Sequence, residues 1–171
     1  MKHHFEMFAL YNRWANERLY DAVRPLPEEE FQRNRGAFFG SLCGTLNHLV
    51  VADRIWLRRF TGEGPVHGRL DEMLHEQLAP LEVVRREEDE RIIGYVDSLG
   101  EADLDQTFSY RTITGSMEMT QPRAAALSHF FNHQTHHRGQ AHCLLSEAAG
   151  RDAAPSLDLI LFQRETGIGL A

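Results

Sequence analysis

The residues of this 171-residue chain whose types and spacing suggest chemistry are its histidines. Five of the ten histidines fall between His129 and His142. At about 100° per residue of a helix, His129, His133 and His137 follow one another at steps of about 40° and form one stripe. Phe130 lies beside this stripe, which indicates that it faces the protein interior. An imidazole buried without a partner is costly, and a metal ion would satisfy its ring nitrogen.

Helix geometry limits how many of these histidines can share one ion. Two histidines four residues apart can direct both rings at one metal. Each four-residue step rises about 6 Å, so His129, His133 and His137 do not all reach one ion through bonds of about 2.1 Å. At most one adjacent pair does so. His133 belongs to both possible pairs, and the spacing leaves open whether its partner is His129 or His137.

A third ligand must come from elsewhere in the chain, and His48 is the best candidate. It lies among Leu46, Leu49 and Val50, in the middle of another predicted helix. Three histidines with one open position are typical of a catalytic metal site rather than a structural one. The alternative is that these histidines only form hydrogen bonds in a bundle without metal, because a single histidine on an apolar face is usually a core residue.

Long helices must position these side chains. Apolar residues at steps of three and four predict four helices, over residues 3–24, 41–60, 70–99 and 122–150. Proline or glycine residues mark their ends, and Pro80 marks either a kink in the third helix or its start near Leu81. A short helical turn is expected at 27–31, and a further short helix at 156–165.

The period changes between Gln106 and Thr120, where short alternating runs flank Thr114 and Gly115. This pattern predicts a small β-hairpin inserted before the last long helix. The chain therefore reads as one all-α domain over residues 1–171, a four-helix bundle with a hairpin insertion. Periodicity by itself favours the simplest up-down topology.

The composition excludes several classes of partner. The chain has 18 basic and 25 acidic residues, a net charge of −7, so phosphate backbones would repel it and no nucleic acid is expected. No apolar run approaches the roughly 20 residues of a membrane helix, and no membrane partner is expected. The first residues do not resemble a signal peptide. We therefore expect a cytoplasmic protein whose Cys43 and Cys143 are reduced.

Three segments resemble the DinB/YfiT-like superfamily of metalloenzymes in order and spacing. The first is YNRWAN at residues 11–16. The second is TLNH at 45–48, followed by Ala52 and Trp56. The third and most specific is LSHFFNHQTHHRGQ at 127–140. Their order and spacing agree with those of this superfamily over nearly the whole chain.

The resemblance implies an up-down-down-up four-helix bundle, in place of the simple up-down order. It also implies a divalent-metal site, commonly zinc or nickel, formed by His48, His133 and His137, and it places His129 beside that site. Homodimers are frequent among such proteins. Related members are thiol-dependent S-transferases or isomerases that use a low-molecular-weight thiol such as bacillithiol or mycothiol.

From these observations we expect a metal-dependent enzyme that acts on a small electrophilic substrate. A metal held by three neutral imidazoles lowers the pKa of a thiol or water in its open position. A thiolate would make the protein an S-transferase, and hydroxide would make it a hydrolase. The sequence does not identify a catalytic residue or general base. The alternative is a non-catalytic metal-binding module of a stress response.

Overall fold

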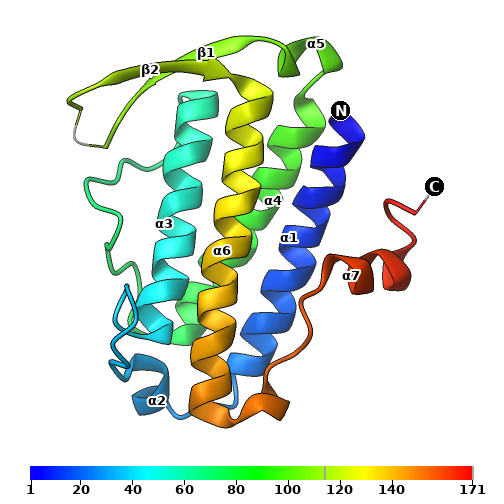
Figure 1. The fold of residues 1–171 in the computed structure, drawn as a ribbon. Helices are drawn as coiled ribbons and strands as arrows, with labels where there is room; N and C mark the ends of the chain where they lie inside the picture. Colours follow the sequence, from blue (N-terminus) through cyan, green and yellow to red (C-terminus); the bar gives the residue numbers. More distant parts are fainter. Residues whose placement is uncertain (114, 171) are drawn as a thin grey trace.

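Four long helices lie side by side and form most of the molecule (Figure 1). The computed structural model describes residues 1–113 and 115–170. The elements of the described part are, in chain order, α1 (Lys2–Val23), α2 (Glu28–Gln32), α3 (Leu42–Thr61), α4 (Leu78–Ser98), α5 (Glu101–Leu104), β1 (Thr107–Arg111), β2 (Glu118–Pro122), α6 (Arg123–Ala149), the 3-10 turn η1 (Arg151–Ala153) and α7 (Leu159–Thr166).

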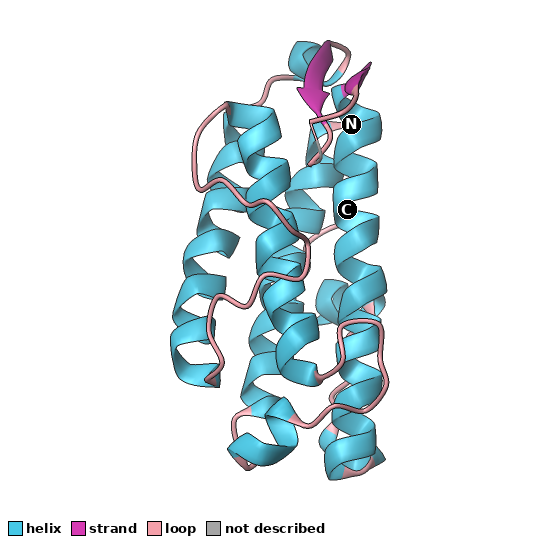
Figure 2. Cartoon of the chain, turned by 90° about the vertical axis from the view of Figure 1, so that its left-hand side faces the viewer, coloured by secondary structure: helices cyan, strands magenta, loops and turns pink. Residues whose placement is uncertain are grey.

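The four long helices follow an up-down-down-up order. Helices α1 and α6 run in one direction and α3 and α4 in the other, and α1 and α3 each pack against both α4 and α6 (Figure 1). This confirms the topology that the resemblance implied, and the simple up-down order is wrong. Because α3 and α4 are parallel, the segment 62–77 must return along the side of the bundle before α4 begins (Figure 2).

The helix ends follow local sequence signals. The Ser41 hydroxyl accepts a hydrogen bond from the Gly44 N–H at 3.0 Å and caps the start of α3. Gly62, with φ 81°, ends α3 in the left-handed region. The third predicted helix is too long at its start. It begins at Leu78, so Pro80 lies in the first turn, where a missing N–H costs no helical hydrogen bond.

The predicted hairpin is present. Strands β1 and β2 pair antiparallel, from Thr107 opposite Pro122 to Arg111 opposite Glu118. Of the predicted turn residues, Thr114 lies outside the described part of the chain. The hairpin lies across one end of the bundle (Figure 1), and Tyr110 packs its ring 5.3 Å from that of Trp56 on α3. The hairpin thus covers the end of the bundle that contains Trp56.

The core divides into apolar clusters at the two ends of the bundle and a polar layer between the helices. One cluster is built on leucines such as Leu19 and Leu46, and another on aromatic residues such as Phe5 and Phe130. None of the described helices is long and apolar enough to cross a membrane.

The polar layer connects all four long helices. Arg85 of α4 forms ion pairs with Asp53 of α3 at 2.6 Å and with Asp89 of α4 at 3.0 Å. The Asn16 amide of α1 donates to Asp89 at 2.9 Å, and Arg138 of α6 donates to the Asn16 oxygen at 3.2 Å. All five side chains are buried. These contacts fix how the helices lie against one another, including the pair that carries the histidines.

Candidate metal centre

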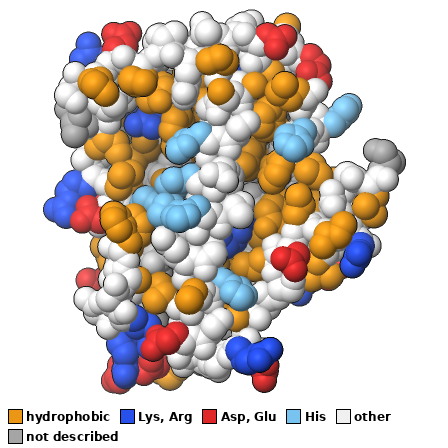
Figure 3. All heavy atoms as spheres, viewed as in Figure 1, with side chains coloured by type: hydrophobic (Ala, Val, Ile, Leu, Met, Phe, Trp, Pro, Cys, Tyr) orange, Lys and Arg blue, Asp and Glu red, His pale blue; other side chains and the backbone are white. Residues whose placement is uncertain are grey.

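Three histidines from two helices meet between α3 and α6. His48 belongs to α3, and His133 and His137 lie one turn apart on α6. One ring nitrogen from each lies within 4.8 Å of the other two. The ring centroids are 4.3 Å apart for His133 and His137, and 4.4 and 5.2 Å apart for His48 and these two. Histidine side chains gather near the middle of this face of the molecule (Figure 3). We call this group the three-histidine cluster.

Hydrogen bonds orient two of the rings. Nδ1 of His48 lies 2.8 Å from the Leu70 carbonyl oxygen, and Nδ1 of His137 lies 2.8 Å from Oε1 of Gln140. Because both partners are acceptors, each Nδ1 carries the proton, which leaves the lone pair on Nε2. A hydrogen bond to the second ring nitrogen is the usual support of a metal-binding histidine.

The cluster fits a divalent metal ion. Nε2 of His48 is buried and has no hydrogen-bond partner among the described residues, which is costly unless another group satisfies it. Two metal–nitrogen bonds of about 2.1 Å span at most about 4.2 Å, so ring nitrogens within 4.8 Å of one another need only small movements to share one ion. The donor set consists of nitrogen alone, which suits zinc and other late transition metals.

The aromatic ring of Phe39 forms one wall of the cluster. It stacks on His48 at a centroid distance of 3.8 Å and meets His137 edge-on at 5.5 Å. This close packing depends on Gly44, because a Cβ at that position would lie 2.1 Å from the Phe39 carbonyl oxygen. Gly44 therefore lets the segment before α3 approach the helix and place the Phe39 ring over His48.

The environment keeps the rings uncharged. Burial lowers the pKa of His133 to about 3, and repulsion from His137 and His48 adds to this effect. Burial also lowers the pKa of His48 to about 4, although the Leu70 carbonyl opposes the shift. The pKa of His137 is lowered as well, again chiefly by burial. At neutral pH the rings are thus in the form that binds metal.

The other histidines of α6 lie outside the cluster. His129 packs its ring 5.1 Å from that of Trp56 and 5.9 Å from that of His133. His136 contacts Gln140, and His142 lies 2.8 Å from the Pro155 carbonyl oxygen. Of the two pairs that the helix spacing allowed, the structure brings the second one, His133 with His137, together with His48. That these three bind a metal remains a prediction.

Sequence reasoning missed the groups around the cluster. The Leu70 carbonyl comes from the segment 62–77, and no sequence signal marks which carbonyl would face His48. Phe39 belongs to the loop before α3 and has no periodicity that would place it. Gln140 is different, because its spacing from His137 already places it on the same side of the helix, and only its role was open.

Comparison with known proteins places the chain in a family. A sequence profile of the DinB family matches residues 1–167, so the chain belongs to the DinB family. One curated relative, Protein DinB of Bacillus subtilis (strain 168), is 26% identical over 162 residues, which cover 91% of this chain and 92% of the relative. The resemblance drawn from the three sequence segments is confirmed.

Proposed function

We propose that this protein is a metal-dependent enzyme that acts on a small electrophilic substrate. The observation that carries the proposal is the convergence of three neutral imidazoles from α3 and α6, with one nitrogen of each within 4.8 Å of the others. A cluster of three nitrogen donors leaves at least one coordination position for a reactant.

The three histidines of the cluster would bind the ion, and neighbouring residues orient two of their rings. His48, His133 and His137 would hold the ion through ring nitrogens. The Leu70 carbonyl orients the His48 ring and Gln140 orients the His137 ring, each through a hydrogen bond to the Nδ1 atom of the histidine. A divalent ion held there would lower the pKa of a thiol or water molecule bound beside it, which supplies a nucleophile near neutral pH. Phe39 stacks on His48 and covers the ring from solvent.

A low-molecular-weight thiol is our preferred nucleophile, which makes the reaction an S-transfer. Support comes from the resemblance to thiol-dependent relatives and from the cluster itself, which has no cysteine of its own and would need an external sulfur. Among the described residues the two cysteines are free, and burial raises the pKa of the Cys43 thiol to about 11. The Cys43 thiol is thus a poor nucleophile. The alternative to S-transfer is hydrolysis, with water as the nucleophile.

The first test is metal content in tag-free protein. We expect about one divalent ion per chain in the wild type, zinc or nickel. Replacing His48, His133 or His137 by alanine should each remove most of it. The matched control is His142→Ala, because His142 lies on the same helix and contacts Pro155 instead. Full metal content in His133→Ala would overturn the proposal.

The second test separates an enzyme from a non-catalytic metal-binding module. The metal-loaded protein is assayed with a panel of thiols and small electrophiles, and with esters in the absence of thiol. Turnover that a chelator abolishes and added metal restores supports the enzyme. Metal binding without turnover of any pair supports the module.

The remaining properties are proposals that rest on the resemblance and the composition. We propose that the chain acts in the cytoplasm, where small thiols are kept reduced, and that its substrate is a small molecule rather than a nucleic acid or a membrane. We also propose a homodimer. Light scattering at several protein concentrations measures its mass directly.

A further inference from the structure

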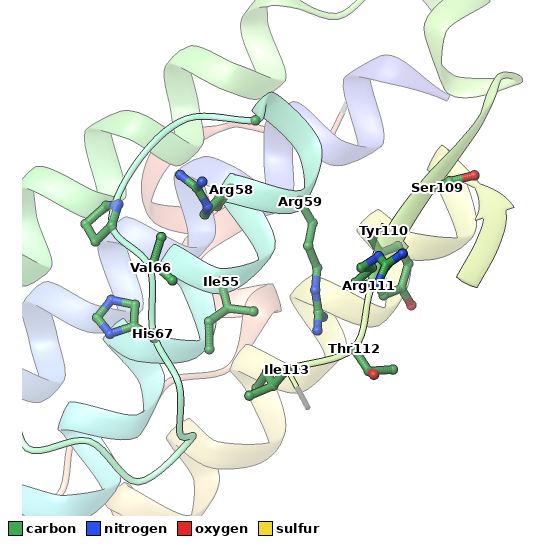
Figure 4. A pocket seen from close by; sticks show the side chains of 12 residues that line it. Ile55, Arg58, Arg59, Val66, His67, Ser109, Tyr110, Arg111, Thr112 and Ile113 are labelled. Atoms are coloured by element: carbon green, nitrogen blue, oxygen red, sulfur yellow. The ribbon is translucent and has the colours of Figure 1, made fainter. Parts of the chain in front are cut away.

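A cavity of about 450 Å³ opens beside α3, at the end of the helix away from the start that Ser41 caps. Its size is typical of small-molecule sites. The walls come from α3, from the returning segment 62–77 and from the end of β1 (Figure 4). We call it the arginine cavity, after the residues that matter most in it: Arg58, Arg59 and Arg111, with Ile55, Tyr110 and Ile113 as its apolar and aromatic part.

The charge of this cavity is opposite to that of the whole protein. The chain carries a net charge of −7, yet three arginines and no carboxylate line the cavity. Within the described ranges, none of Arg58, Arg59 and Arg111 has an ion pair with an acidic side chain. Most other arginines of the bundle do have such a partner. Glu118 lies opposite Arg111 in the hairpin but does not line the cavity. An excess of guanidinium groups over carboxylates in a hollow attracts anions.

Arg59 is held in place by aromatic rings rather than by a counter-ion. Its guanidinium lies 4.5 Å from the ring centre of Trp56 and 4.6 Å from that of Tyr110. Figure 4 shows the side chain extending from α3 towards Tyr110 and Arg111. Burial lowers the pKa of Arg59, which means that lost hydration is not replaced by a nearby negative charge. A bound anion would supply that charge.

Arg58, unlike Arg59, is hydrogen-bonded to the backbone of the cavity wall. It donates a hydrogen bond to the Gly64 carbonyl at 2.7 Å and so fastens the wall that the segment 62–77 provides. Further along this wall, His67 contacts Glu72 at 2.6 Å, and Glu72 also accepts from the Gly68 N–H at 2.7 Å. These hydrogen bonds fix the conformation of the wall. Of the three arginines, Arg59 and Arg111 remain available to a ligand.

The arginine cavity lies on the same side of α3 as the three-histidine cluster. Ile55 follows His48 by seven positions and Arg59 follows it by eleven, so their backbones lie about 10 and 16 Å further along the axis. A series of ring contacts also joins the two sites: Trp56 lies 5.1 Å from His129, and His129 lies 5.9 Å from His133. A molecule that reaches from Arg59 to the three-histidine cluster must therefore be elongated.

We propose that the arginine cavity binds the anionic group of the substrate, a carboxylate or phosphate attached to an apolar or flat body. Arg59 and Arg111 would contact the oxygens of the anion, and Ile55, Tyr110 and Ile113 would contact the body. This inference rests on the proposed function, because its purpose is to direct the other end of the substrate to the three-histidine cluster. Binding of the anion itself requires no metal.

The test uses Trp56 as a reporter, because the Arg59 guanidinium stacks on it. The chain has two tryptophans, so Trp14→Phe leaves Trp56 as the single one. Emission is followed while benzoate, phenyl phosphate or neutral benzyl alcohol is added to the metal-free full chain. We expect a saturable change with at least one of the two anions and none with benzyl alcohol at the same concentrations. The anion that binds identifies the chemistry.

Variants then assign the binding to the cavity. Arg59→Gln or Arg111→Gln should weaken anion binding roughly tenfold or more, as expected for loss of a charge-assisted hydrogen bond. The control is Arg18→Gln, since Arg18 lies 4.8 Å from the Trp14 ring, outside the cavity, and this change should leave the affinity unaltered. Arg111 is exposed at the end of β1, so Arg111→Gln decides the matter if Arg59→Gln does not fold.

Three results would overturn the inference. The first is that neither anion shows saturable binding. The second is that the parent and the Arg111→Gln variant bind the anion with equal affinity. The third is that the parent binds benzyl alcohol as tightly as it binds the anion. Metal content is measured on the same samples. Anion binding without metal leaves this inference standing and removes the proposed function, whereas metal without anion binding does the reverse.

Discussion

The imidazoles of His133 and His48 are uncharged at neutral pH because the surrounding residues replace the water that a cationic ring would need. Burial is the largest cause of both pKa shifts. Bringing three rings together adds repulsion between any two that would be protonated. The same packing that makes protonation unfavourable leaves lone pairs directed at one another. The geometry of such a site could hold a metal cation in place of a proton.

This arrangement predicts a loss of stability in acid. A histidine that titrates near 6.5 in the unfolded chain and at about 3 in the folded one lets the unfolded state bind more protons between these values. Its contribution to folding is therefore full above pH 6.5 and is lost as the pH falls towards 3. We expect the free energy of unfolding of the metal-free wild type to fall more between pH 7 and pH 5 than that of His133→Leu. Denaturant titrations at both pH values measure it, and equal losses would contradict the assignment.

Gly44 offers a second prediction at this scale. A methyl group there would lie 2.1 Å from the Phe39 carbonyl oxygen, so Gly44→Ala must displace the segment that holds the Phe39 ring over His48. We expect a loss of about 1–3 kcal/mol of stability and weaker metal binding, measured by thermal denaturation and metal titration.

The control for this substitution is Gly94→Ala on α4. No atom lies within 4 Å of the position that the new Cβ would occupy, and alanine favours the helix by roughly 0.5–1 kcal/mol. Gly94→Ala should stabilise the protein and leave metal binding unchanged. A neutral effect of Gly44→Ala would mean that Phe39 is not held as the structure indicates.

Part of the candidate site could be predicted from the sequence, and part could not. The spacing of His133 and His137 is local and fixed by helix geometry, so one turn predicts their proximity. His48 could be named as the third ligand from its place among apolar residues of another predicted helix. The choice of His137 over His129 depends on how two helices pack, and it required the family resemblance. The Leu70 carbonyl and the arginine cavity depend on a loop and on the hairpin, where no periodicity constrains which atoms face one another.

At the scale of elements, the four long helices were predicted within a few residues, apart from the start of α4. The apolar period of three and four residues is strong in amphipathic helices and ends clearly at proline and glycine. Residues 70–77 do not continue the helix, although their composition did not exclude it. No local sequence pattern predicts that α3 and α4 are parallel, because a connection as long as the segment 62–77 permits either direction.

The layer around Arg85 predicts a large effect from a single change. Arg85 is buried and forms ion pairs with Asp53 and Asp89. Arg85→Leu would leave two carboxylates without their counter-ion, and we expect a loss of about 3–5 kcal/mol. Denaturant unfolding monitored by circular dichroism measures the change.

Arg86, the next residue on α4, is the control for Arg85→Leu. It forms an exposed ion pair with Glu82 one turn away, and such pairs contribute only about 0–1 kcal/mol. Arg86→Leu should therefore have little effect on stability. Similar losses in both variants would show that helix propensity, and not the buried ion pairs, governs the result.

At the scale of the whole molecule, a metal in the three-histidine cluster would connect helices that come from the two halves of the chain. Any ligand that binds the folded state alone stabilises it, by about 2.7 kcal/mol when its free concentration is 100 times Kd. For a chain of this size we expect zinc or nickel to raise Tm by roughly 5–10 °C. A chelator should reverse the rise, and His137→Ala should abolish it. An equal rise in that variant would point to another binding site.

The segment 62–77 exists because α3 and α4 run in the same direction, and it touches both the cluster and the arginine cavity. To the cluster it presents the Leu70 carbonyl, which any amino acid at that position would supply. To the cavity it presents exposed residues such as Val66, which do not contribute to the packing of the helices. Mutations can therefore accumulate along this stretch and alter the lining of the cavity, while the bundle and the three-histidine cluster stay as they are. A scaffold of this kind separates the residues that shape the cavity from those that hold the bundle together, so the first can change without cost to the second.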